Sequence, residues 1–168
     1  MSNIVRLVAL VCWACSVAVT VAAQASPTHN PLGRWLTANG HGVVEIAPCG
    51  DTLCGRIVGI DRAPTEPMPT DVDGRPQCGL TIIHNERRLA DGIWRGAVTD
   101  PRDGRTYHAE LWVDDDDNLH LRGYLGIPLL GETQIWHRYT GALTADCGLV
   151  PHATQPPPPT IRADLSAD

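Results

Sequence analysis

The chain has 168 residues, 13 basic and 19 acidic side chains, and a formal net charge of −6. It has no lysine, and no serine between Ser26 and Ser166. A Ser-His-Asp hydrolase, a Schiff-base enzyme and a phosphate-loop nucleotide binder therefore each lack a residue that they require. The acidic charge, without a basic patch, also argues against nucleic acid as a partner, because phosphates would be repelled.

Residues 1–25 have the anatomy of a secretory signal peptide. A short head with Arg6 precedes the apolar run LVALVCWACSVAVTVAA, and Ala23 and Ala25 form a small-residue cleavage site. A retained membrane anchor is the alternative, but the apolar run is short and has no stop-transfer flank. We expect cleavage after Ala25, export to the periplasm or the medium, and no transmembrane anchor afterwards. Cleavage removes one Arg and no acid, so the net charge falls from −6 to −7.

Eight runs with the composition of β-strands follow in chain order, separated by turn signals such as Asn-Gly and Asp-Gly. The short connections predict antiparallel pairing of successive strands. In 106–113, Tyr107, Ala109, Leu111 and Val113 fall on one face and polar residues on the other. An up-and-down barrel satisfies this pattern best, because closure removes the free sheet edges. The eight runs are 34–38, 43–47, 55–60, 80–84, 93–99, 106–113, 119–125 and 133–139.

Two proline-rich segments lie outside this pattern. Residues 61–79 contain four prolines and separate the third strand from the fourth. Since proline cannot extend a central ladder, we expect a loop that covers a site. Residues 149–168, which include QPPPPT, predict a disordered tail. The domain organisation is therefore a signal peptide at 1–25, one β-barrel domain at 26–148 and the tail.

Four cysteines remain after cleavage, an even number that in an exported chain usually indicates disulfides. Cys49 and Cys54 flank the segment 50–53, so we expect them to lie opposite one another across a four-residue hairpin loop. This leaves Cys78 to pair with Cys147. A zinc site is the alternative, but the cysteine spacing fits no usual ligand pattern.

The two ends of the predicted barrel carry a matching pair of motifs. The first strand begins Gly33-Arg34-Trp35 and the last ends Trp136-His137-Arg138. This resembles the calycins, the lipocalin and fatty-acid-binding barrels, in which a Gly-x-Trp opens the first strand and an Arg of the last strand packs across the Trp. The resemblance implies barrel closure by Gly33, Trp35 and Arg138, with the guanidinium stacked on the indole.

A more specific resemblance covers the chain from Leu32 to about Tyr139. The segments GRWLT, VVEIAPCGDTLCGRIVGI, CGLTII, WRGAVTDPRDGRTYHAEL and LRGYLGIPLLGETQIWHR, in this order and spacing, resemble the bacterial domain-of-unknown-function 2147 family (DUF2147) of exported proteins. The resemblance implies a small secreted β-barrel. It supplies no activity and no catalytic residues.

No set of residues indicates catalysis, a metal site or a cofactor. DVDG at 71–74 fails the EF-hand pattern at its first and last ligand positions and indicates a polar turn. The run DDDDN at 114–118 indicates a solvated hairpin tip. Asp100 and Asp103 indicate a turn in which a carboxylate caps the local backbone. The histidines do not show the paired spacing of metal ligands.

Arg122, Tyr124 and Trp136 form the candidate ligand-binding set, because the first two share a strand face and Trp136 lies on the neighbouring strand. The alternative is outward packing that stabilises the hairpin.

An exported barrel that binds a small apolar ligand or an envelope component is the function that these features predict. The chain has no Phe and its strands are rich in Gly and Ala, which leaves interior volume, and we expect the mouth near residues 61–79. The alternatives are an interaction module with a filled core and an envelope enzyme that uses Asp, His or Tyr at the barrel mouth. The oligomeric state is left open.

Overall fold

The structure is a computed structural model, and it describes residues 29–150. Eight strands and one short 3₁₀ helix make up its regular structure in this range. The elements are β1 (Gly33–Leu36), β2 (Gly42–Cys49), β3 (Thr52–Ile60), β4 (Thr81–Arg88), β5 (Trp94–Thr99), β6 (Thr106–Val113), β7 (Asn118–Tyr124), η1 (Pro128–Leu130) and β8 (Glu132–Arg138).

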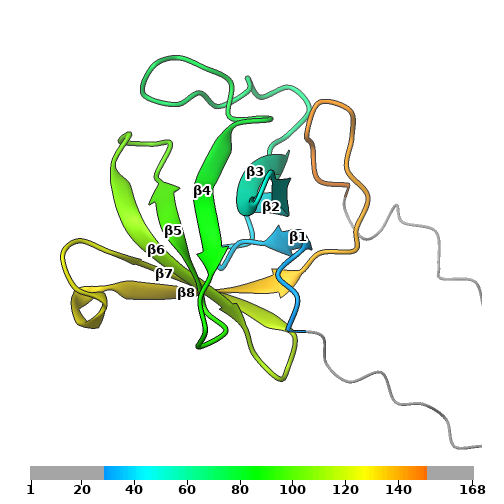
Figure 1. Ribbon diagram of the computed structural model, residues 1–168. Coiled ribbons are helices and arrows are strands. Elements are labelled where there is room, and N and C mark those ends of the chain that lie inside the picture. The colour runs from blue at the N-terminus through cyan, green and yellow to red at the C-terminus, as the bar shows by residue number, and fades with distance from the viewer. Residues whose placement is uncertain (1–28, 151–168) are drawn as a thin grey trace, which may run out of the picture.

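The eight strands form one closed antiparallel barrel in sequence order, in which β8 returns to pair with β1 (Figure 1). This confirms the predicted all-β, up-and-down barrel. Its two ends differ. The β1–β2, β3–β4, β5–β6 and β7–β8 connections lie at one end, here called the mouth, and the β2–β3, β4–β5 and β6–β7 turns lie at the other, here called the closed end.

The interior is lined by alternate residues of each strand, as a barrel requires. In β6, Ala109, Leu111 and Val113 are buried, which confirms the face predicted from the alternation. Side chains from all around the wall form one core cluster, and Trp35, Ile83, Leu111 and Leu119 are completely buried in it.

The seam between β1 and β8 is closed by Trp35 and Arg138, as the calycin resemblance implies. The two residues are Cα partners, and the guanidinium carbon of Arg138 lies 4.0 Å from the centre of the indole ring. Arg138 also donates to the Leu32 carbonyl at 3.0 Å and to Asp117 at 2.7 Å. Gly33 has a φ of +114°, and a Cβ there would lie 3.3 Å from the Arg138 guanidinium, so glycine suits both the backbone and the close approach.

Two details differ from the sequence predictions. The turn between β2 and β3 has two residues, Gly50 and Asp51, where a four-residue loop was expected, because the hairpin ladder continues to the Cys49–Thr52 pair. Strand β4 continues to Arg88, four residues beyond the predicted end. The register shifts between His84 and Arg87, which indicates a bulge, and such a bulge interrupts the alternation by which strands are recognised.

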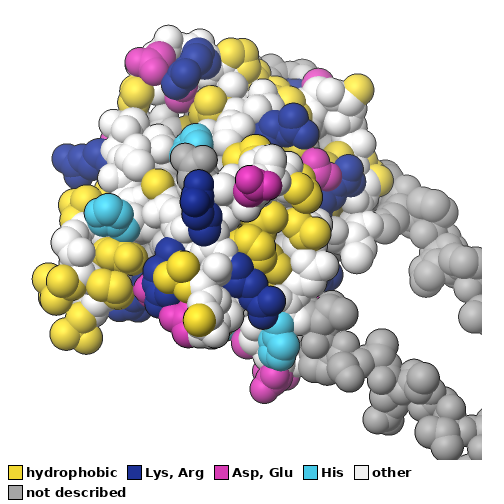
Figure 2. All heavy atoms as spheres, viewed as in Figure 1, with side chains coloured by type: hydrophobic (Ala, Val, Ile, Leu, Met, Phe, Trp, Pro, Cys, Tyr) yellow, Lys and Arg dark blue, Asp and Glu magenta, His cyan; other side chains and the backbone are white. Residues whose placement is uncertain are grey.

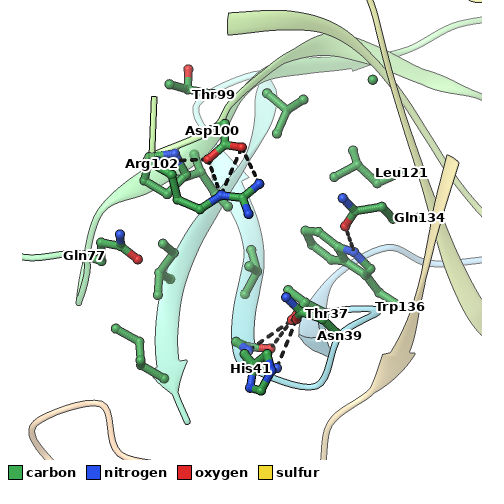
Figure 3. Close-up of a pocket in the computed structure, with 18 of the residues that line it drawn as sticks. Thr37, Asn39, His41, Gln77, Thr99, Asp100, Arg102, Leu121, Gln134 and Trp136 are labelled. Carbon is green, nitrogen blue, oxygen red and sulfur yellow. Dashed lines mark hydrogen bonds and ion pairs between the residues drawn. The ribbon is translucent and has the colours of Figure 1, made fainter. Parts of the chain in front are cut away.

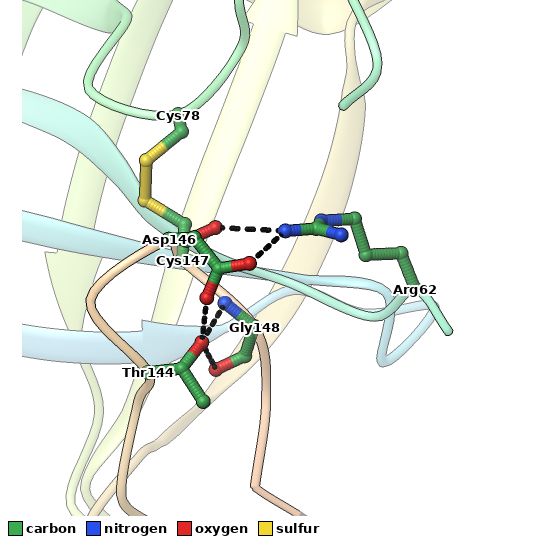
Figure 4. Close-up of a disulfide and its surroundings, with 6 residues drawn as sticks. All are labelled: Arg62, Cys78, Thr144, Asp146, Cys147 and Gly148. Atoms are coloured by element: carbon green, nitrogen blue, oxygen red, sulfur yellow. Dashed lines mark hydrogen bonds and ion pairs between the residues drawn. A yellow bond between two sulfur atoms is a disulfide. The ribbon is translucent and has the colours of Figure 1, made fainter. Parts of the chain in front are cut away.

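Both predicted disulfides are present. Cys49 and Cys54 have a Cα–Cα distance of 5.7 Å and bridge the β2–β3 hairpin diagonally, since Cys54 stands opposite Ala47. Cys78 and Cys147 have a Cα–Cα distance of 5.9 Å and connect the β3–β4 loop to the segment after β8 (Figure 4). Disulfides are typical of proteins that fold in an oxidising, exported environment.

The segment after β8 lies along the end of β3 at the mouth. Ile60 donates its backbone N–H to the Cys147 carbonyl at 2.7 Å and forms a bridge with Gly148. Arg62 makes an ion pair with Asp146 beside the disulfide (Figure 4). The disulfide and the ion pair therefore fix both this segment and the start of the β3–β4 loop.

The predicted signal peptide and most of the predicted tail, from residue 151, lie outside the described residues. Between residues 29 and 150, no helix has the length and apolar character needed to cross a membrane.

Candidate ligand-binding cavity

The barrel contains a cavity of about 590 Å³ at its mouth. Residues from strands β2 to β8 and from the β1–β2, β3–β4 and β5–β6 connections contribute to its wall, whereas none of β1 does. A cavity of this size falls within the range of small-molecule sites. As predicted, it opens beside the β3–β4 loop, since Asp61 and Gln77 both line it.

The floor of the cavity is apolar. Leu121 and Trp136 enter it from the neighbouring strands β7 and β8 (Figure 3). Trp136 is only 3% exposed, and its indole N–H donates to the Gln134 side chain at 2.9 Å, so the ring presents carbon to the cavity. Val44, Ile57 and Val98 complete this floor.

Because Gly123 has no side chain, the part of the cavity beside it is empty. A Cβ at this position would meet only Val98 at 3.7 Å and Tyr107 at 3.8 Å, which are ordinary contacts. A side chain could therefore grow from Gly123 without displacing the backbone. The prediction that glycine positions leave interior volume holds at Gly123, but it fails at Gly55, where a Cβ would lie only 2.8 Å from the Ile83 side chain.

The rim of the cavity is polar and partly ordered by ion pairs. In the β5–β6 turn, Arg102 donates to both carboxylate oxygens of Asp100, at 3.0 Å and 2.6 Å (Figure 3). The hydrogen bond from Arg102 holds the pKa of Asp100 below its usual value. The carboxylate also accepts the Arg102 backbone N–H, which confirms the capped turn expected at this site.

Across the cavity, the β1–β2 turn supplies a second polar cluster. The Asn39 side chain accepts hydrogen bonds from the Thr37 hydroxyl at 2.8 Å and from the His41 backbone N–H at 3.1 Å (Figure 3). The His41 ring lies 3.2 Å from the Asp61 carboxylate. Because both clusters stand above an apolar floor, the site suits a molecule with an apolar body and a polar end.

The structure separates the three residues predicted to contact a ligand. Trp136 faces the interior and lines the cavity. Arg122 stands opposite Glu110 and Tyr124 opposite His108, on the outer face of the wall, where the Tyr124 and His108 rings lie 5.5 Å apart. Arg122 binds the β7–β8 loop instead, with its Nε donating to the Pro128 carbonyl at 2.7 Å. Alternation along β7 places Leu121 and Gly123 inward, and this signal was present in the sequence.

Sequence reasoning also missed a buried acid. Glu86 is completely buried, and neither of its carboxylate oxygens has a hydrogen-bond partner among the side chains and backbone groups that the structure describes. It faces inward because it stands opposite Leu53, a buried residue of β3. Burial raises the pKa of Glu86 to about 8, so the neutral acid dominates at neutral pH. Glu86 does not line the cavity. The sequence Glu86-Arg87-Arg88 gave no sign of burial, because a run of charges normally ends a strand at the surface.

The acidic turns act as local caps. Asp71 accepts the backbone N–H groups of Asp73 and Arg75, which confirms the polar turn expected at DVDG. Asp114 accepts from Asn118 and His120, and the hydrogen bond from His120 lowers the Asp114 pKa to about 2. In the described part of the chain, no three side chains of the His, Cys, Asp or Glu type are grouped so as to hold a metal ion.

Comparisons with known proteins agree with this architecture. The model of a family described as uncharacterized protein conserved in bacteria (DUF2147) matches residues 33–138. The structure is similar to that of protein HP1028 from Helicobacter pylori, described as belonging to the lipocalin family. The two share 15% sequence identity with a TM-score of 0.57, over 67% of this chain and 85% of that one. At this identity the likeness concerns the fold. No curated protein matches the chain.

Proposed function

Since the chain belongs to the DUF2147 family of uncharacterized bacterial proteins and folds as a lipocalin-like barrel, we propose that it is an exported binding protein whose mouth cavity holds one small, largely apolar ligand. The cavity of about 590 Å³ carries this proposal. We further propose that the protein works in the periplasm or the medium, and that the ligand is a free small molecule or part of an envelope component.

The distribution of polarity in the cavity supports a ligand with two parts. Its apolar body would lie on Leu121 and Trp136, where burial from water supplies the binding free energy. Its polar end would remain at the rim, where Asp100 and Asn39 present oxygen atoms that accept hydrogen bonds. Asp61 and Glu132 add two further carboxylates to the lining, so a neutral or cationic end would be favoured over a carboxylate.

An environment-sensitive, uncharged apolar dye tests the cavity directly. The delipidated protein should bind it saturably with a stoichiometry near one, as one preformed pocket requires. Gly123→Leu should weaken dye binding at least about tenfold, because the new side chain occupies volume that the apolar body needs. Isothermal titration calorimetry and fluorescence measure the same constant independently.

Ala97→Leu provides the matched control. Ala97 stands opposite His108, on the outer face of the wall, so Ala97→Leu adds three of the four carbon atoms that Gly123→Leu adds, but outside the cavity. Dye binding should be unchanged in this variant, and circular dichroism should show that both variants are folded. Loss of binding in both variants, or no saturable binding by the parent protein, would contradict the proposal and favour an interaction module.

A further inference from the structure

The β7–β8 loop carries a group of exposed aliphatic side chains, here called the apolar tip. Leu125 is 64% exposed, Ile127 55%, Leu129 82% and Leu130 77%. Figure 2 shows these hydrophobic side chains gathered where Figure 1 places the η1 loop. A soluble protein rarely leaves so many large aliphatic residues together in water unless they contact something.

The apolar tip is a fixed structure. Residues 125–131 read LGIPLLG and contain no charge and no polar side chain. Leu130 donates its backbone N–H to the Ile127 carbonyl at 3.2 Å, and Gly131 donates to Pro128 at 2.9 Å. The loop folds back onto β7, since a Cβ at Gly131 would lie only 2.7 Å from the Gly123 carbonyl and 2.8 Å from the Tyr124 Cβ.

Arg122 supports the tip from below. Its guanidinium donates to the Pro128 carbonyl at 2.7 Å, to the Leu129 carbonyl at 3.4 Å and to the Thr133 hydroxyl at 2.7 Å. The backbone carbonyls of Ile127, Pro128 and Leu129 therefore already accept hydrogen bonds from donors within the protein. A loop that satisfies its own carbonyls can leave water at a lower cost than one that depends on solvent for them.

The position and shape of the tip indicate what contacts it. The tip projects from the mouth, because Gly123 and Glu132, which flank the loop, both line the cavity. It is a convex projection from one side of the barrel, and both ends of the described chain leave on the other side (Figure 1). A projecting, uncharged, aliphatic loop fits a deformable apolar phase better than a flat protein surface. The chain's net charge of −6 argues against attraction to an anionic surface.

We propose that the apolar tip inserts into the interfacial region of a lipid bilayer and holds the barrel with its mouth toward the membrane. The four aliphatic side chains supply the affinity, and Arg122 remains at the level of the headgroups. This contact does not require that the cavity be occupied. It would place the mouth where an apolar molecule could pass between bilayer and barrel.

Vesicle sedimentation tests this proposal. The probe is phosphatidylcholine vesicles, with vesicles of phosphatidylethanolamine and phosphatidylglycerol in a 3:1 ratio as a second composition. The chain used begins at residue 26, because the apolar run at 7–23 would itself bind lipid, and it retains every described strand. Binding to phosphatidylcholine is expected, and it should not fall as salt is raised, since the interaction is apolar.

Leu129→Ser combined with Leu130→Ser should lower the partition coefficient by roughly tenfold or more. Leu89→Ser is the matched control, because Leu89 is 47% exposed but lies in the β4–β5 turn at the closed end; it should sediment like the parent. Gly123→Leu should also sediment like the parent, which separates this proposal from ligand binding in the cavity. A tryptophan placed by Leu129→Trp should be quenched by brominated acyl chains, and one placed by Leu89→Trp should not.

Three outcomes would overturn the proposal. The first is no sedimentation of the parent with either vesicle. The second is an equal loss in the tip and Leu89 variants. The third is a dimer, detected by light scattering, that the tip variant abolishes while no vesicle binding is seen, since a second copy would then cover the tip.

Discussion

The two ends of this barrel are built from the same strands, but the closed end is densely packed and the mouth contains a cavity. At the closed end, Trp35 is completely buried beneath Arg138, which is itself bound to Asp117 and to backbone carbonyls. At the mouth, Gly123 and the polar turns leave a cavity of about 590 Å³. Packing and charge pairing are concentrated where the barrel must be sealed, and volume is left where a ligand can be admitted. Stability and binding should therefore respond to mutations at different ends.

The closure pair should produce the largest loss of stability. Trp35→Ala should lower the free energy of unfolding by about 3–5 kcal/mol, because it removes the largest fully buried side chain of the core. Arg138→Ala should cost about 1–3 kcal/mol, and the double variant should be non-additive by about 0.5–2 kcal/mol, since the two side chains stack. Urea unfolding measures all three values.

Trp112→Ala is the control for the closure pair. Trp112 stacks on His120 with ring centres 4.9 Å apart on the outer wall, so its truncation should cost less and add independently to Arg138→Ala. Strict additivity of Trp35→Ala and Arg138→Ala would mean that the stacking contributes nothing.

The two disulfides should differ in their contributions, one at each end. Replacing Cys78 and Cys147 with Ser should lower the unfolding free energy by about 4 kcal/mol, and replacing Cys49 and Cys54 by about 2 kcal/mol. The difference follows from sequence separations of 69 and 5 residues, because the longer loop restricts the unfolded chain more. Equal losses in urea unfolding would show that chain entropy does not determine the ranking.

Glu86 should make the free energy of unfolding depend on pH. Its pKa is about 8 in the folded protein and near the ordinary value of 4.5 when unfolded, so the folded state binds more protons between these values. The resulting stability is fully present below about pH 4.5 and is lost as the pH rises through 8, at up to about 1.4 kcal/mol per pH unit. Glu86→Gln should flatten this part of the profile.

The test is urea unfolding at several pH values between 5 and 9, in which the difference between the parent and Glu86→Gln isolates this one group. Glu132→Gln, at an exposed position on the mouth, is the control for replacing one carboxyl by an amide. Parallel profiles for the parent and Glu86→Gln would show that the Glu86 carboxyl finds a partner or solvent in solution.

Local patterns in the sequence predicted most of the fold. Alternation and turn residues identified all eight strands, because each hairpin is a local structure whose signals lie within a few residues. The disulfides followed from the number of cysteines, and the Trp35–Arg138 pair from motifs at the two ends. The extension of β4 was missed because its bulge breaks the two-residue period on which strand recognition depends.

The candidate site was harder to predict, because it depends on which face of each strand turns inward. Trp136 lines the cavity, but Arg122 and Tyr124 lie one position away from the inward-facing Leu121 and Gly123, and a shift of one residue exchanges the two faces. Asp117 was expected only in a solvated turn, and nothing local could reveal that Arg138 would bind it from the end of β8.

The seam also determines the order in which the barrel can form. Arg138 and Leu32, which its guanidinium binds, are 106 residues apart, whereas every other neighbouring pair of strands is consecutive in the chain. Closing so long a loop costs more entropy than forming any single hairpin, so the seam should form after the meander. A chain that folds while it is being synthesised or exported cannot complete its barrel until β8 is available. Until then, the edge of β1 that β8 will occupy remains unpaired and can pair with other chains.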